Sequence, residues 1–124
     1  MAVNINGLEA WTQTKETLSE NLHSTLELLA SAPFSDDPAS PYARAQAEQS
    51  RLLDAMQRHA VAGIRQIDET IAASGIVAEI GALSKEAKAE ADALKNAAKT
   101  IDGITQAVNL VAGVVAKFAA LPFI

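Results

Sequence analysis

The side chains that most often carry catalysis or bind metals are sparse in this sequence. It contains no cysteine and only two histidines, His23 and His59, which fall in two different predicted helices. Without cysteine, disulfides, zinc–thiolate sites and thiol catalysis are excluded. Because the two histidines are not expected to converge, we interpret them as surface or boundary residues. We therefore predict no metal site and no cofactor.

Two acidic pairs are the remaining candidates for cation binding or acid–base chemistry. Asp36 and Asp37 fall among prolines, where a cation site would need further oxygen ligands at loop spacing. Asp68 and Glu69 fall in a predicted helix and fit a solvated surface pair. We identify no phosphate-cradling glycine loop and no nucleophile–base pair. We predict that the chain is not an enzyme and takes no small-molecule substrate.

The arginines follow a regular spacing. All four lie seven residues apart, at Arg44, Arg51, Arg58 and Arg65. In one helix this interval places them on a slowly drifting stripe. One function for such a stripe is phosphate or nucleic-acid binding. The net charge of −5 and the lack of interleaved aromatic residues argue against it, so we predict no nucleic-acid partner.

The arginine stripe instead predicts a ladder of ion pairs between two helices. In an antiparallel hairpin whose facing residue numbers add to about 74, Glu9 faces Arg65 and Glu16 faces Arg58. Leu22 then faces Leu52, so the apolar pattern predicts the same register. The structural charge ladder predicted from this register consists of Glu9, Glu16, Arg44, Arg51, Arg58 and Arg65.

The periodicity of apolar residues predicts an all-α chain. Apolar residues make up 49% of the sequence and aromatic residues 4%, a mixture that suits close-packed helices better than sheets. We predict helix 1 over 7–32, ended by Pro33, a proline-rich loop over 33–41, and helix 2 over 41–74. Ser40 is the expected N-cap of helix 2, with Pro41 at its first position.

A third helical segment is predicted over 76–121, with candidate breaks near 82–84 and at Gly103. The predicted fold is an antiparallel helical hairpin plus this long third helix. Such a chain forms a three- to four-helix bundle with coiled-coil-like packing, in a single helical domain over residues 1–124.

The C-terminal part of this segment is the most apolar part of the chain. It has no charge from Gly103 to Ala116, and Lys117 is the only charge between Gly103 and Ile124. A straight third helix packed antiparallel on helix 2 would overhang the hairpin, so a partner or lipid would have to cover it. The alternative is a bend at Gly103 or Gly113 that folds the segment back. The predicted interface residues are Ile104, Val108, Val111, Ala112, Val114, Val115, Phe118 and Leu121.

Two functions compete for this segment. The leading hypothesis is a non-catalytic interaction or assembly protein that self-associates, or binds a helical partner, through its C-terminal helix. The alternative is a membrane-active protein, such as a pore-forming component, translocator or small secreted effector. Residues 104–123 are about long enough to span a bilayer, and Ala112, Ala116 and Ala120 have the small-residue spacing of close helix pairs.

In length and helical hairpin the chain resembles small secreted helix-turn-helix proteins of the WXG type. Trp11 is followed by Thr12 and Gln13, so the signature turn is missing. The long helices with an apolar stretch are also similar in pattern to helical pore-forming toxins. Met1 to Gly7 is neither basic nor continuously apolar. We therefore expect either a cytoplasmic protein or one exported without a signal peptide, with membrane association under the alternative function.

Overall fold

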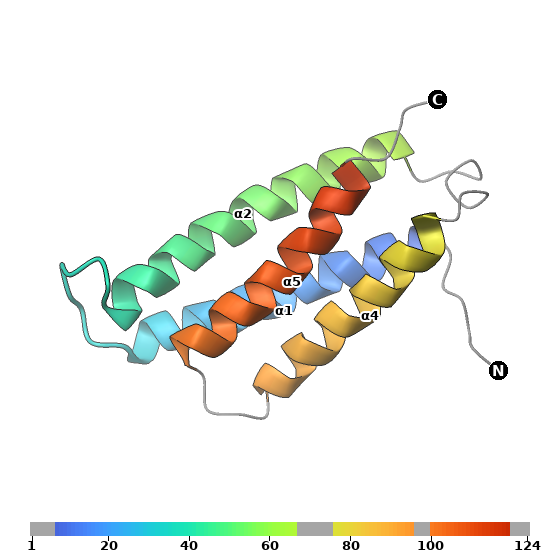
Figure 1. Cartoon of the computed structure of the whole chain (residues 1–124). Helices are drawn as coiled ribbons and strands as arrows, with labels where there is room; N and C mark the ends of the chain where they lie inside the picture. The colour runs from blue at the N-terminus through green and yellow to red at the C-terminus, as the bar shows by residue number, and fades with distance from the viewer. Residues whose placement is uncertain (1–6, 67–75, 96–99, 120–124) are drawn as a thin grey trace.

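A computed structural model describes residues 7–66, 76–95 and 100–119. They form four helices, α1 (Gly7–Ser31), α2 (Pro41–Gln66), α4 (Ile76–Lys95) and α5 (Ile101–Ala119). The helices pack against one another in a bundle, and none of the described residues lies in a strand (Figure 1). The prediction of an all-α, three- to four-helix bundle is confirmed. Residues 67–74 of predicted helix 2 and Leu121 lie outside the described residues.

The connection between α1 and α2 follows the turn signals of the sequence. The Asp37 carboxylate accepts a hydrogen bond from the backbone N–H of Ala39 at 3.0 Å, which shapes the loop. The Ser40 hydroxyl accepts one from the N–H of Ala43 at 3.2 Å, so Ser40 caps α2. Pro41 is the first helical residue, where its missing N–H costs nothing. The predicted cap is confirmed.

The segment predicted as one long third helix is divided into α4 and α5. The Thr100 hydroxyl caps α5 by accepting a hydrogen bond from the N–H of Gly103 at 3.1 Å. The break predicted near 82–84 is wrong, because Ser84 lies inside α4 and its hydroxyl bonds to Gln13 of α1 at 2.8 Å. Neither glycine bends the chain, since α5 runs through Gly103 and Gly113.

The order of the helices around the bundle differs from their order in the chain. α1 and α2 are antiparallel, as predicted, but α4 packs beside α1 and α5 beside α2 (Figure 1). α2 and α4 lie at opposite corners and make at most marginal contact in the described part of the chain. The predicted pairing of helix 2 with the start of the third segment is therefore wrong. α1 and α5 each pack against all three other described helices.

Candidate functional site: helix α5 and the residues that enclose it

The predicted interface residues of α5 lie inside the bundle. Those that are 3% exposed or less are Ile104, Val108, Val111, Val114, Val115 and Phe118. Ala112 is half-buried, and Leu121 lies outside the described residues. The predicted overhang is wrong. The fold-back alternative is the one observed, and the chain reverses between Lys95 and Ile101, not at either glycine.

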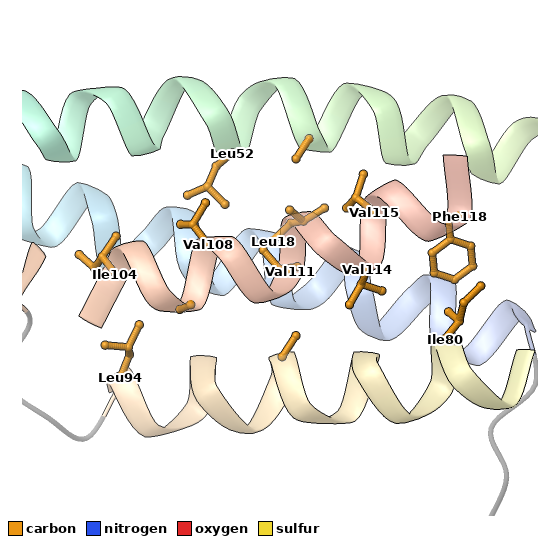
Figure 2. Close-up of a cluster of buried hydrophobic side chains, with 14 of the residues drawn as sticks. Leu18, Leu52, Ile80, Leu94, Ile104, Val108, Val111, Val114, Val115 and Phe118 are labelled. Atoms are coloured by element: carbon orange, nitrogen blue, oxygen red, sulfur yellow. The ribbon is translucent and has the colours of Figure 1, made fainter. Parts of the chain in front are cut away.

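Each neighbouring helix contributes large apolar side chains to the surface that covers α5. Leu18 comes from α1, Leu52 from α2, and Ile80 and Leu94 from α4 (Figure 2). Ile104 lies toward Leu94 and Phe118 toward Ile80, so α4 and α5 run in opposite directions. Burying one large aliphatic side chain contributes about 1.5–3 kcal/mol. α5 therefore supplies the largest continuous part of the core.

The arginine stripe forms interhelical contacts, but with α5 instead of α1. Arg44 pairs with Asp102 at 2.8 Å, and Arg51 donates to the side-chain oxygen of Asn109 at 2.8 Å. Arg58 pairs with Asp54 of its own helix at 3.0 Å. The predicted pair with Glu16 is not formed. The Arg65 side chain lies outside the described part, so its predicted pairing with Glu9 is not tested.

Both contacts with α5 join residues 58 positions apart. The seven-residue spacing of the arginines thus matches a seven-residue spacing on α5, because α2 and α5 run parallel. The next position in this series is Ala116, which offers no polar atom to Arg58. A small pocket of about 200 Å³ lies there between α2 and α5, lined by Arg51, Asp54, Ala55, Arg58, Ala112, Val115, Ala116 and Ala119.

The register of the α1–α2 hairpin is also shifted from the prediction. The Trp11 indole N–H donates to the His59 carbonyl at 2.9 Å, and the His59 ring bonds to the Trp11 carbonyl at 2.8 Å. Facing residue numbers therefore add to 70, about one helical turn away from the predicted register. Exposed ion pairs contribute only about 0.2–1 kcal/mol each, so packing of Trp11 on His59 outweighs them.

The histidine interpretation is half correct. His23 is exposed and pairs with Glu27 at 2.6 Å, as a surface residue would. His59, in contrast, is 1% exposed and lies where α1, α2 and α5 meet. Trp11 and Phe118 bury its ring. Both are far from His59 in the sequence, so the local pattern could not predict this contact.

The face that α1 turns toward the core is unexpectedly polar. The buried polar side chains on it are Thr14, Thr17, Asn21, Ser24 and Thr25. Leu22, which was predicted to face Leu52, lies partly to one side of this face, since it and Leu29 are only half-buried. The intervals of three and four residues among these polar positions were the signal that could have identified this face.

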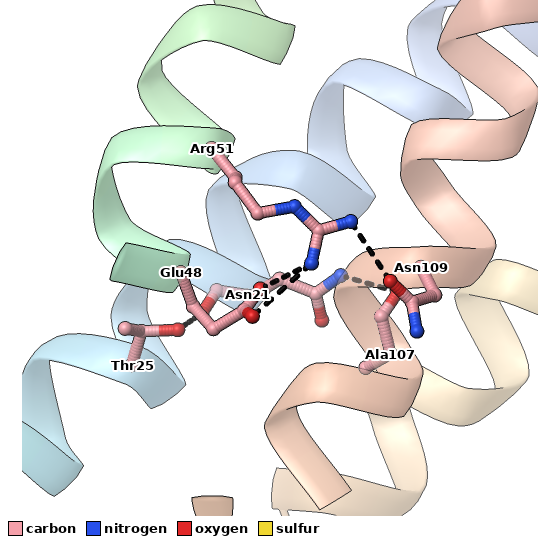
Figure 3. Close-up of polar contacts among 6 residues, drawn as sticks. All are labelled: Asn21, Thr25, Glu48, Arg51, Ala107 and Asn109. Atoms are coloured by element: carbon pink, nitrogen blue, oxygen red, sulfur yellow. Dashed lines mark hydrogen bonds and ion pairs between the residues drawn. The ribbon is translucent and has the colours of Figure 1, made fainter. Parts of the chain in front are cut away.

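These polar groups are mostly satisfied locally. Thr17 and Thr25 donate to carbonyls of α1 itself, at 2.9 and 2.8 Å. The Asn21 side-chain N–H donates to the Ala107 carbonyl of α5 at 3.3 Å (Figure 3). Its side-chain oxygen is buried and has no hydrogen-bond partner among the described residues. Among the described residues, few direct hydrogen bonds therefore join α1 to α5, although the interface is buried.

Glu48 is the buried acidic residue of this region. It lies on α2 and is 7% exposed, and both of its oxygens accept hydrogen bonds from Arg51 at 2.9 and 3.1 Å (Figure 3). Arg51 thus neutralises a buried charge and, through Asn109, holds α5. No second acid, nucleophile or histidine accompanies Glu48 and Arg51 among these contacts.

In the described part of the chain, no three His, Cys, Asp or Glu side chains lie together as a metal site would require. By length and composition, α5 is the one helix in the described ranges that is able to cross a membrane. A core helix of a water-soluble bundle satisfies the same two criteria.

Comparison with known proteins adds no further information. No family model matches the chain, and no curated protein or solved structure is significantly similar to it.

The burial of α5 predicts unequal effects of a charge at two adjacent positions. Val115→Asp places an unpaired carboxylate in the core and should lower the free energy of unfolding by roughly 3 kcal/mol or more. Ala116→Asp changes an exposed residue and should lower it by no more than about 1 kcal/mol. Urea denaturation followed by circular dichroism measures both. Equal, small losses would show that Val115 is not in the core.

The parallel α2–α5 register predicts coupling between Arg51 and Asn109. A double-mutant cycle with alanine at both positions should give a coupling free energy of about 0.2–1 kcal/mol. The cycle cancels the separate contribution of the Arg51–Glu48 pair. A matched cycle at Glu16 and Arg58 should give a value near zero. Coupling between Glu16 and Arg58, with none between Arg51 and Asn109, would instead support the predicted ladder between α1 and α2.

Proposed function

We propose that this chain is a non-catalytic helical interaction protein that binds an amphipathic helix of a second copy or of another protein. The supporting observation is the location of its exposed apolar residues. Among the described side chains, the large apolar ones that are exposed come only from α1, α2 and the loop between them. They are Leu26, Phe34, Leu53 and Val61.

The outer face of α2 offers the most suitable surface for such a helix. Leu53, Met56 and Ala60 form a row with intervals of three and four residues along an open groove, whose other lining residues are Ser50, Asp54 and Gln57. Leu53 is 48% exposed. Single exposed apolar residues are common, but a row at helical spacing suits the anchors of an amphipathic helix.

Association through α5 itself, the leading prediction from the sequence, requires more than surface contact. The apolar residues of α5 are covered by the other three helices, so a partner reaches them only when the bundle opens. In the closed bundle, the α2 groove is available to a partner without rearrangement.

This proposal predicts a specific effect of Leu53→Gln. Because Leu53 is exposed, the free energy of unfolding should change by no more than about 0.5 kcal/mol. Burial of one leucine in an interface contributes about 1.5–3 kcal/mol. Its loss should therefore weaken association by roughly 10- to 100-fold. Sedimentation over a range of concentrations measures self-association, and pull-down from the native host tests a different partner.

The matched control is Ala89→Gln, an exposed position on α4. It should leave association unchanged. A chain that stays monomeric at all concentrations, and that captures the same proteins with and without Leu53, would contradict the proposal.

A membrane-active protein is the second candidate, and the charge pattern of α5 favours it. Its charges lie only near its ends, at Asp102 and Lys117. Its 19 residues span about 28 Å, close to the ~30 Å of a bilayer core. Separation of α1 from α5 would also return buried hydroxyl groups to water, which lowers the free-energy cost of opening.

The membrane candidate predicts dye release from lipid vesicles that depends on release of α5. A double variant, Asn21→Cys with Ala107→Cys, would link α1 to α5 through positions that are in contact. The chain has no other cysteine. The oxidised variant should release little dye, and reduction should restore release to the level of the unmodified chain. Equal release in both states would exclude insertion of α5.

A further inference from the structure

His59 lies at the end of the bundle where α5 meets the α1–α2 hairpin. Its ring stacks on Trp11 with centroids 4.8 Å apart and an interplanar angle of 16°. Phe118, in the last turns of α5, meets the same ring edge-on at 5.1 Å. His59 therefore connects the C-terminal end of the apolar helix to both helices of the hairpin.

The hydrogen bonds of His59 determine which of its nitrogens carries the proton. Nε2 lies 2.8 Å from the Trp11 carbonyl oxygen. A carbonyl can only accept, so Nε2 carries the hydrogen and Nδ1 is unprotonated in the neutral ring. Nδ1 is buried and has no hydrogen-bond partner in the described part of the chain. A second proton would therefore create a charged ring with a buried N–H that has no acceptor.

The surrounding charges do not compensate for this. On α1, the Lys15 ammonium lies 5.8 Å from the centre of the Trp11 ring and adds positive potential. On α2, Arg58 pairs with Asp54, and on α5, Lys117 pairs with Glu79 of α4 at 2.8 Å. No described carboxylate bonds to the His59 ring. Burial lowers the pKa of His59 below its usual 6.5; the Trp11 carbonyl opposes this shift, and Lys15 adds to it.

We propose that His59 is an acid-sensitive latch. Its neutral ring holds Phe118 and the C-terminal part of α5 against the hairpin, and its protonation loosens that contact. This inference goes beyond the proposed function and does not depend on what the chain binds.

The direction of the effect follows from proton linkage. An opened state takes up the proton at the ordinary pKa of 6.5, whereas the closed state resists it. The contribution of the neutral His59 ring to the stability of the closed bundle is therefore fully present above about pH 6.5, and it decreases as the pH falls from that value toward the lower pKa of the closed state. The equilibrium constant for opening should increase by up to about tenfold per pH unit.

Amide hydrogen exchange of the full chain at about pH 7.5 and about pH 5.5 tests the latch. Most ordinary carboxylates remain ionised at both values, because their pKa lies near 4. After correction for intrinsic exchange, the amides near Phe118 should open several-fold more often at the lower pH. His59→Phe keeps an aromatic ring beside Trp11 but cannot titrate, so this change should disappear.

The matched control is His23→Gln, which removes the exposed histidine and should keep the full response. The proposal is overturned if protection near Phe118 is the same at both pH values, or if His59→Phe responds as the unmodified chain does. Should His59→Phe fail to fold, an NMR titration of the unmodified chain decides. A measured pKa of His59 at or above about 6.5, with the contact to Phe118 still present after protonation, would exclude a latch.

Discussion

The aliphatic surface of α5 must be covered, and most of the architecture follows from this. Side chains project from α5 in several directions, so one neighbouring helix cannot bury them all. α1, α2 and α4 each pack against it, and α4 lies beside α1, where it leaves the position next to α2 to α5. As a result α2 and α4, which are consecutive in the described sequence, lie at opposite corners of the bundle (Figure 1).

α1 covers α5 with a surface that is partly apolar and partly polar. Leu18 provides apolar contact, but Thr17, Asn21 and Thr25 are buried beside it. The threonine hydroxyl groups bond within α1, so they fill space without joining the helices. Each contributes less than a buried aliphatic side chain would, because removing a hydroxyl from water has a free-energy cost. The face of α1 that lies against α5 is thus held less strongly than a wholly aliphatic face of the same size would be.

Polar contacts between α2 and α5 define their relative position along the bundle. Arg44 and Arg51 meet Asp102 and Asn109 at equal spacing, which is consistent only with parallel helices in one register. Arg51 also neutralises the buried Glu48, so the contact with Asn109 is supported by a charge that would be costly to leave unpaired. The register of α5 on α2 is therefore determined by side chains near the bundle surface as well as by the apolar core.

Local features of the chain were predictable from sequence alone. The helical periods, the Ser40 cap and the all-α class depend on contacts between residues a few positions apart, and the structure agrees with them. Most of the apolar positions on α5 were also identified as needing burial. The helices that bury them could not be predicted, because the apolar pattern specifies a buried face without specifying which helix packs on it.

Only the tertiary structure decided which helices meet. A seven-residue charge spacing fits an antiparallel or a parallel partner equally well, so Arg51 was assigned to α1 although it binds Asn109 of α5. The seclusion of His59 depends on Trp11 and Phe118, which are 48 and 59 residues away in the chain. Contacts at such separations depend on how all the apolar faces pack into a single core. A local sequence pattern does not specify that packing.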